Sequence, residues 1–265
     1  MATEPEARPL TPEQTAPERE RAFEAFEQIF NVHRAALQVF GLVPSLPDAE
    51  SLLETQIKLA QVQRGNLGVD VNQSASELLA IATAERGRGF ETMRRLTLVS
   101  VCGALEYLVK AVLVDQVASD HDEAAALLSK SKIKFNASEV LGLTPSEQWF
   151  VIADRLFEQL ADPHPLMHAR SVRLLTGFAP FPYGDEQKDQ ITDALTQDEV
   201  RSFNQAFLIR NCLVHNGGKV SSPLARFSGL SRGTLLSVDS RSGTAQLLAI
   251  RKFAQTINNV WLGSL

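Results

Sequence analysis

The sequence lacks most of the patterns that identify the common classes of extracellular and membrane protein. It contains two cysteines in 265 residues, Cys102 and Cys212, and both lie in apolar stretches rather than in closely spaced pairs. We therefore expect free, reduced thiols, as in cytosolic proteins, and no disulfide framework. No run of about 18 consecutive apolar residues occurs, and residues 1–20 lack a basic start followed by an apolar stretch. These absences predict a cytoplasmic protein with no signal peptide and no membrane span.

Motifs for cofactors and for the common hydrolases are also missing. The chain has no Walker or Rossmann glycine loop, no C-x-x-C pair, no G-x-S-x-G motif and no internal repeat. His164 and His168 form one H-x-x-x-H pair, a spacing that can bind zinc on one face of a helix. No third ligand is evident nearby, so we expect no metal and no cofactor.

Charge is low overall but unevenly distributed. The net charge is −5, which argues against a protein that coats nucleic acid. Residues 1–30 carry −4 and residues 116–200 carry −7, whereas residues 201–252 hold eight basic side chains against one acidic and carry +7. A basic segment in an otherwise acidic chain suits binding of one nucleic-acid backbone at one place. An equally open interpretation is a solvated surface whose charge the acidic helices balance.

Apolar residues recur at helical spacing along most of the chain and predict an all-α helical bundle. The most apolar stretch lies within residues 76–119, which we expect to be the central helix, broken or bent at Gly87 and Gly89. Thr144-Pro145-Ser146-Glu147 is a helix-start signal. A small hairpin is expected at Leu235–Val238 with a turn at 239–243. Helices are expected at about 20–40, 48–63, 76–119, 120–131, 144–160, 165–175, from 185, at 197–215 and at 245–262.

This pattern predicts one domain with an N-terminal tail. Residues 1–19 combine four prolines with several glutamates and show no apolar period, so we expect a disordered acidic tail. Residues 20–265 should form a single all-α domain. Its core is expected at about residues 76–262, with extra N-terminal helices and a loop-rich segment after the helix at 197–215.

One stretch combines residues that can carry chemistry. Residues 208–220, LIRNCLVHNGGKV, place Arg210, Asn211 and His215 in the pattern R-N-x-x-x-H. The following Asn-Gly-Gly is a helix stop, so His215 should lie in the last turn of its helix. Asn211 and His215 are four residues apart and share a face, whereas Arg210 can converge on them only because arginine is long.

These residue types suit cleavage of RNA without a metal. An imidazole exchanges protons near neutral pH, and an arginine fork can hold a phosphate and the charge that develops on it. The R-N-x-x-x-H pattern near the end of a late helix resembles the R-x(4–6)-H signature of the HEPN superfamily. This superfamily consists of all-α domains and includes many metal-independent ribonucleases of bacterial defence and toxin systems.

The resemblance covers about residues 76–262 in architecture, but only Arg210–His215 and its flanks in specific residues. It implies an endoribonuclease that acts by attack of the RNA 2′-hydroxyl. The implied partners are RNA, a second copy of the chain in a homodimer that forms the active cleft, and an antitoxin or another protein of a defence system. The residues assigned on this basis are Arg210, Asn211 and His215 as catalytic, Glu106 as supporting, and Lys219, Arg226 and Arg232 as RNA-binding.

Two questions stay open at this point. Glu106 is the only acid between Glu91 and Asp115, in the middle of the apolar run, so it either pairs with Arg210 or faces water. Arg210 can serve in catalysis, or it can form an ion pair with a neighbouring helix while His215 caps the carbonyls of its own helix. The alternative function is a non-catalytic helical module that binds a nucleotide, RNA or a partner protein.

Overall fold

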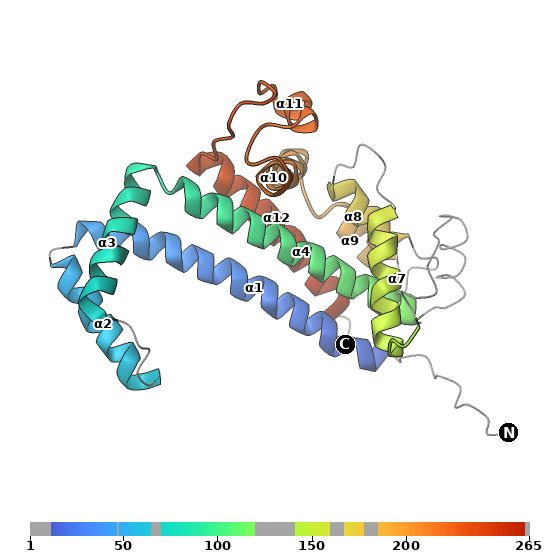
Figure 1. Cartoon of the computed structure of the whole chain (residues 1–265). Helices are drawn as coiled ribbons and strands as arrows, with labels where there is room; N and C mark the ends of the chain where they lie inside the picture. Colours follow the sequence, from blue (N-terminus) through green and yellow to red (C-terminus); the bar gives the residue numbers. More distant parts are fainter. Residues whose placement is uncertain are drawn as a thin grey trace.

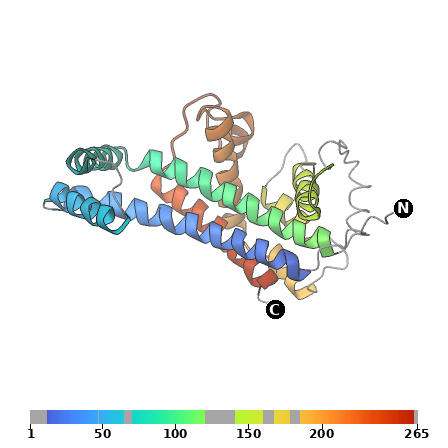
Figure 2. The ribbon, with the colours of Figure 1, turned by 60° about the horizontal axis from the view of Figure 1, so that its bottom comes forward.

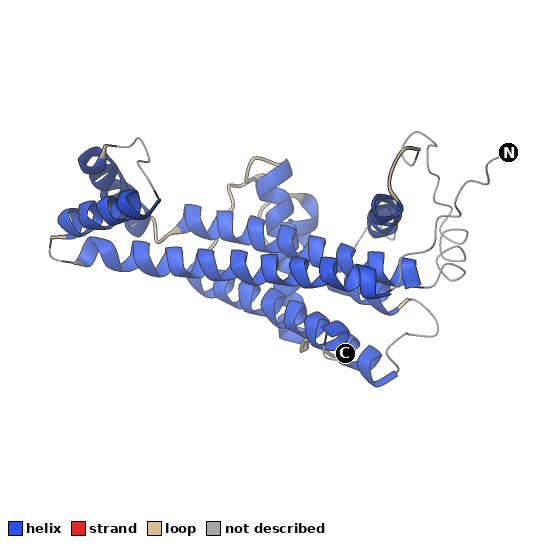
Figure 3. Ribbon diagram, turned by 90° about the horizontal axis from the view of Figure 1, so that it is seen from below, coloured by secondary structure: helices blue, strands red, loops and turns tan. Residues whose placement is uncertain are grey.

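The computed structural model describes residues 12–46, 48–64, 70–119, 141–159, 167–177 and 185–262, and within them the chain is all-α, as expected. The described residues contain no strand, only one isolated bridge between Lys219 and Leu235 (Figure 3). The helices are α1 (Pro12–Leu42), the 3-10 helix η1 (Val43–Ser45), α2 (Ala49–Arg64), α3 (Val71–Gly87), α4 (Glu91–Ser119), α7 (Pro145–Gln159), α8 (Met167–Thr176), α9 (Asp185–Thr192), α10 (Gln197–His215), α11 (Ser222–Ser228) and α12 (Ser240–Leu262).

Helix α4 is the centre of the bundle. It lies antiparallel to α1 and also packs on α7, α10 and α12 (Figure 1). Among the described residues it is the one helix long and apolar enough to cross a membrane, but 61% of its most apolar window is buried inside the protein. That burial is typical of the core helix of a soluble protein. The fully buried side chains of α4 include Leu98, Val101, Leu105, Leu108, Val109 and Val112.

The expected break near Gly87 and Gly89 is confirmed. Helix α3 ends at Gly87, and α4 begins at Glu91 after Gly89 and Phe90 adopt positive φ angles of 63° and 62°. Glycine adopts this conformation without a steric penalty, and phenylalanine does so rarely. Together α2 and α3 form a helical hairpin that projects from the end of the α1–α4 pair (Figures 1 and 2).

Helix α1 begins at Pro12, earlier than the start expected at Glu20. Proline is favoured in a first helical turn because the amide there has no partner inside the helix. Arg19 then anchors the helix on α4, where its Nη1 lies 2.5 Å from Oδ2 of Asp115 and both side chains are buried. Residues 1–11 of the expected tail lie outside the described residues.

Helix α10 carries the R-N-x-x-x-H motif and has well-defined ends. Thr196 and Glu199 form a reciprocal capping box at its start, a helix-start signal that is present in the sequence. At its end, Gly217 and Gly218 adopt φ angles of 58° and 75°, so the expected glycine stop is confirmed. Figure 1 views α10 almost end-on while α4 and α12 lie across the page, so α10 crosses both helices steeply.

The segment after α10 differs from the expectation. Residues 222–228 form the short helix α11, which was not expected, and the hairpin with a turn at 239–243 is wrong. Oδ1 of Asp239 instead accepts hydrogen bonds from the backbone N–H groups of Arg241 and Ser242, both at 2.9 Å. An aspartate that accepts bonds from following amides starts a helix, and α12 begins here.

Four further helices, α2, α7, α8 and α9, agree with the expected pattern. The helix-start signal at Thr144 is confirmed, because the Thr144 backbone N–H donates to Oε2 of Glu147 at 2.7 Å. Helices α2, α8 and α9 also lie close to where the periodicity places them. The helix expected at 120–131, and His164, lie outside the described residues.

Candidate active site

Arg210 lies at the contact between α10 and α4. Its Nη2 donates to Oε2 of Glu106 at 3.0 Å, and its Nη1 donates to Oδ1 of Asn211 at 3.0 Å. The side chains of Arg210 and Glu106 are each 23% exposed. The guanidinium is therefore held by two partners and still reaches solvent, so N–H groups that these partners do not use can contact an anion.

The question about Glu106 is resolved in favour of pairing. The carboxylate is half-buried in the ion pair with Arg210 rather than fully exposed to water. Burial raises the pKa of Glu106 above its ordinary value, and the positive charges of Arg210, Lys110, Arg170 and His215 oppose that shift. Basic side chains of α4, α8 and α10 thus act on the charge of Glu106, and Arg210 contacts it directly.

His215 lies in the last turn of α10 and is exposed. Within the described residues, no hydrogen bond joins its imidazole to a carbonyl of its own helix, as the alternative interpretation required; the carbonyl of Cys212 accepts from the backbone N–H groups of Asn216 and Gly218, at 3.1 and 3.0 Å. Among the described residues, the imidazole has no hydrogen-bond partner in the protein. The imidazole is therefore available to a ligand.

The motif residues share one end of α10 but do not form one bonded cluster. Arg210 and Asn211 contact each other, whereas His215 influences Glu106 through its charge rather than through a hydrogen bond. The convergence expected from the length of the arginine side chain is only partial, because Glu106 draws the guanidinium toward α4. A ligand that contacts both the guanidinium of Arg210 and the imidazole of His215 would have to lie across the last turns of α10.

The three cations assigned to RNA binding follow the motif helix, and all three are exposed. Arg226 lies on α11, while Lys219 and Arg232 lie on either side of that helix in the chain. Lys219 and Arg232 line an open pocket of about 470 Å³ directly beyond the end of α10. Arg226 does not line it. Of the three residues assigned to RNA binding, Lys219 and Arg232 therefore share one pocket and Arg226 lies outside it.

Two arginines of α4, Arg94 and Arg95, hold the chain between α11 and α12 in place, a role that sequence reasoning missed. Arg95 donates to the carbonyl of Leu236 and also pairs with Glu91 at 2.6 Å, one helical turn away. Arg94 donates to the carbonyl of Val238 at 3.4 Å. Because both acceptors are backbone carbonyls at distant positions in the chain, nothing local in the sequence reports these contacts.

Cys102, Cys212 and His168 are buried in the packing of the helices. Cys102 and Cys212 are free and buried, as expected, and burial raises the pKa of the Cys102 thiol. His168 is buried against the rings of Phe203 and Phe253, with ring centroids 5.6 and 5.2 Å away. Within the described residues, no group of three or more His, Cys, Asp or Glu side chains is placed to hold a metal ion.

The arrangement can bind a phosphate and exchange a proton beside it. Arg210 supplies a positioned cation, Asn211 a hydrogen-bonding amide, and His215 an imidazole open to solvent. No protein-family model matches the chain, and the comparisons with curated proteins and with solved structures gave no match either.

Proposed function

We propose that this protein is a metal-independent endoribonuclease of the HEPN type that cleaves RNA by attack of the 2′-hydroxyl. The observation that carries the proposal is the guanidinium of Arg210, held 23% exposed between Glu106 and Asn211, on the same helix end as the His215 imidazole, which has no hydrogen-bond partner among the described residues. An anchored cation and a free proton-transfer group are the two elements that phosphodiester transfer within RNA requires.

Each residue has a distinct part in this scheme. Arg210 binds the scissile phosphate and stabilises the negative charge that develops on it. His215 exchanges a proton with the 2′-hydroxyl or with the leaving oxygen. Asn211 orients the guanidinium through its 3.0 Å hydrogen bond and can turn its amide toward the substrate. Glu106 is a positioning residue that holds Arg210 on α4.

A second candidate function is a non-catalytic helical module that binds a nucleotide, RNA or a partner protein. One observation favours it: the ion pair between Arg210 and Glu106 joins α10 to α4 and would be useful for the fold alone. Digestion of total RNA with and without a chelator distinguishes the two candidates. We expect cleavage at the same rate in both, whereas a binding module leaves the RNA intact, and loss of cleavage that magnesium or zinc restores would contradict the proposal.

The biological setting follows the resemblance. We propose that the protein acts in the cytoplasm, in bacterial antiviral defence or a toxin–antitoxin system, with an antitoxin or another defence protein as partner. The genes that flank its own gene test this proposal. A neighbouring gene whose product suppresses the ribonuclease supports it, and an operon of unrelated metabolic enzymes argues against it.

We expect the active species to be a homodimer with the two α10 ends facing each other across a two-fold axis. One chain supplies one motif imidazole, and cleavage benefits from both a proton acceptor and a proton donor. The cations near His215 would repel across such an axis, so RNA should tighten the dimer and low salt without RNA should weaken it. Sedimentation velocity with and without a 2′-O-methyl oligonucleotide measures this. A monomer that cleaves at full rate at nanomolar concentration contradicts it.

A further inference from the structure

We propose that the pocket between α10 and α11 binds an internal backbone phosphate of the RNA, next to the phosphate held at Arg210. We call it the 219/232 pocket, after its two cations. It is lined by Asn216, Lys219, Val220, Ser221, Ser222, Arg232 and Gly233. The inference rests on the proposed ribonuclease function and extends it, because it assigns a second contact site to the substrate.

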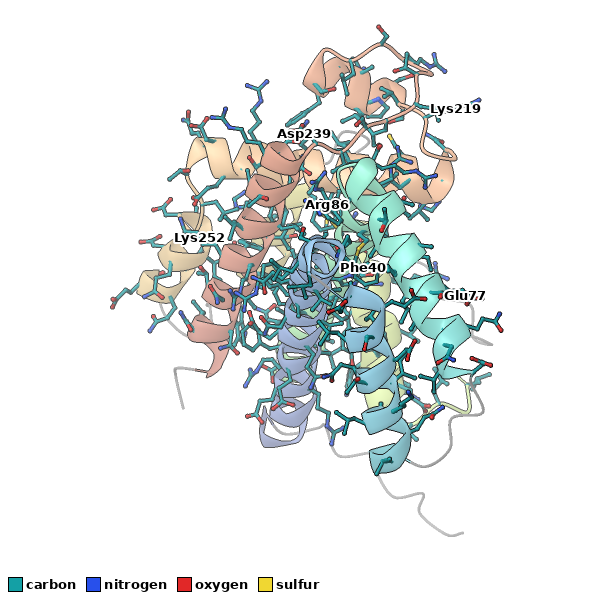
Figure 4. All side chains as sticks on the ribbon, turned by 90° about the vertical axis from the view of Figure 1, so that its left-hand side faces the viewer. Phe40, Glu77, Arg86, Lys219, Asp239 and Lys252 are labelled. Atoms are coloured by element: carbon teal, nitrogen blue, oxygen red, sulfur yellow. The ribbon has the colours of Figure 1, made fainter. Side chains whose placement is uncertain are left out.

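The position of the pocket links it to the motif. Asn216 lines the pocket and follows His215 directly in the chain. A strand whose scissile phosphate lies against the end of α10 can therefore reach the pocket as it leaves the motif. Lys219 lies at the outer edge of the molecule in Figure 4, where an extended strand can reach it.

The pocket has positive charge that the protein does not neutralise. In the basic segment 201–252, Arg210, Arg251 and Lys252 form ion pairs, with Glu106, Glu27 and Glu199 respectively. Lys219 and Arg232 form no ion pair with any of the described residues. Figure 4 also shows Lys219 on the opposite side of the view from Lys252. Two of the unpaired cations of the segment thus lie together at one pocket directly beyond the motif.

The walls of the pocket are fixed by hydrogen bonds within the protein. The backbone N–H of Val220 donates to Thr234 and that of Gly233 donates to Val220, both at 2.9 Å. The N–H of Ser221 donates to Sγ of Cys212 at 3.4 Å, which ties the pocket to the buried face of α10. An anion site whose backbone is already ordered loses little conformational entropy when it binds.

The lining favours a phosphate over a base. It consists of two cations, small polar residues, a glycine and one valine, and no aromatic side chain contributes to it. Single-stranded RNA bases are bound mainly by stacking on aromatic rings, whereas backbone phosphates are bound by lysine, arginine and hydroxyl groups. The geometry therefore points to a phosphodiester as the ligand.

The test is the affinity of a fully 2′-O-methylated oligoribonucleotide with hydroxyl ends, measured by fluorescence anisotropy over a range of salt concentrations. This probe cannot be cleaved by 2′-hydroxyl attack. We expect the double variant Lys219→Ala/Arg232→Ala to bind about 10-fold more weakly than the wild type. The slope of log affinity against log salt concentration should be smaller in magnitude by about 1.4, which corresponds to two lost phosphate contacts.

Arg201→Ala is the matched control. Arg201 is an exposed arginine of the same basic segment 201–252 that forms no ion pair with any of the described residues and does not line the pocket. Its replacement should change the affinity less than about 2-fold. An equal loss in the control and the double variant would mean diffuse attraction rather than a site, and no loss in the double variant would mean that the pocket is not used. Either result overturns the proposal.

A mononucleotide with a terminal phosphate distinguishes the two sources of phosphate. We expect it to bind more weakly than the oligonucleotide, and tighter binding of the mononucleotide overturns an internal phosphodiester as the ligand. The same variants separate this inference from the function on which it rests. A pocket-dependent affinity in a protein that does not cleave RNA removes the ribonuclease proposal, whereas cleavage without pocket dependence removes only the pocket.

Discussion

Replacing either Arg210 or His215 by alanine is expected to lower RNA cleavage at least about 100-fold. Loss of a proton-transfer group typically costs a factor of 10² to 10⁴, and loss of a group that stabilises developing charge costs about 10² to 10³. Both side chains lie near the surface at the end of α10, so neither substitution leaves a cavity in the core. The measurement is the cleavage rate of a defined RNA, with circular dichroism as the check that the helices remain.

Two further variants sharpen this experiment. Arg201→Ala removes an exposed arginine from the other end of α10 and should leave the rate within about 2-fold of the wild type. Glu106→Gln keeps an acceptor for Arg210 but removes the carboxylate charge, so it should slow cleavage less than Arg210→Ala does. Full activity in both the Arg210 and the His215 variants would rule out the proposed roles, and so would a loss of activity that follows only from unfolding.

Phe203→Ala is expected to lower the free energy of unfolding by about 3–5 kcal/mol, the usual cost of removing a buried aromatic ring. Phe203 is fully buried on α10 and contacts the rings of Phe207 and Phe253, with centroids 5.2 and 5.3 Å away. His168 of α8 meets the same ring edge-on. The ring therefore holds together the helices on which the candidate active site is built.

Urea unfolding followed by circular dichroism measures this loss. Val214→Ala is the matched control, because Val214 also lies on α10 and is 48% exposed, so its replacement should change the stability by less than about 0.5 kcal/mol. A loss below about 1 kcal/mol in Phe203→Ala would contradict the packing described here.

The parts of the fold that could be predicted from the sequence are those set by local signals. Apolar spacing places α4 and α12, the glycines at 87 and 89 separate α3 from α4, and the glycines after His215 end α10. The sequence narrowed Glu106 to two alternatives, a pair with Arg210 or a position facing water, and the structure has the pair. The helix ends are set by short stretches of sequence, whereas this pair joins two segments that lie far apart in the chain.

The parts that could not be predicted depend on distant segments. The +7 charge of residues 201–252 does not show which of its cations are neutralised, because the partner of Arg251 is Glu27, far away in the chain on α1. The segment after α10 was expected to contain a hairpin because Leu235–Val238 is apolar. The arginines of α4 instead bind the backbone carbonyls there, and Asp239 starts a helix.

The chemistry of the cut ends tests the ribonuclease proposal most directly. A purified RNA oligonucleotide is incubated with the protein in excess EDTA, and the ends of the products are identified by mass spectrometry. Attack by the 2′-hydroxyl without a metal predicts 2′,3′-cyclic phosphate ends and 5′-hydroxyl ends, and the His215→Ala variant should produce neither. Products with 3′-hydroxyl and 5′-phosphate ends, or RNA that stays intact with the wild-type protein, would contradict it.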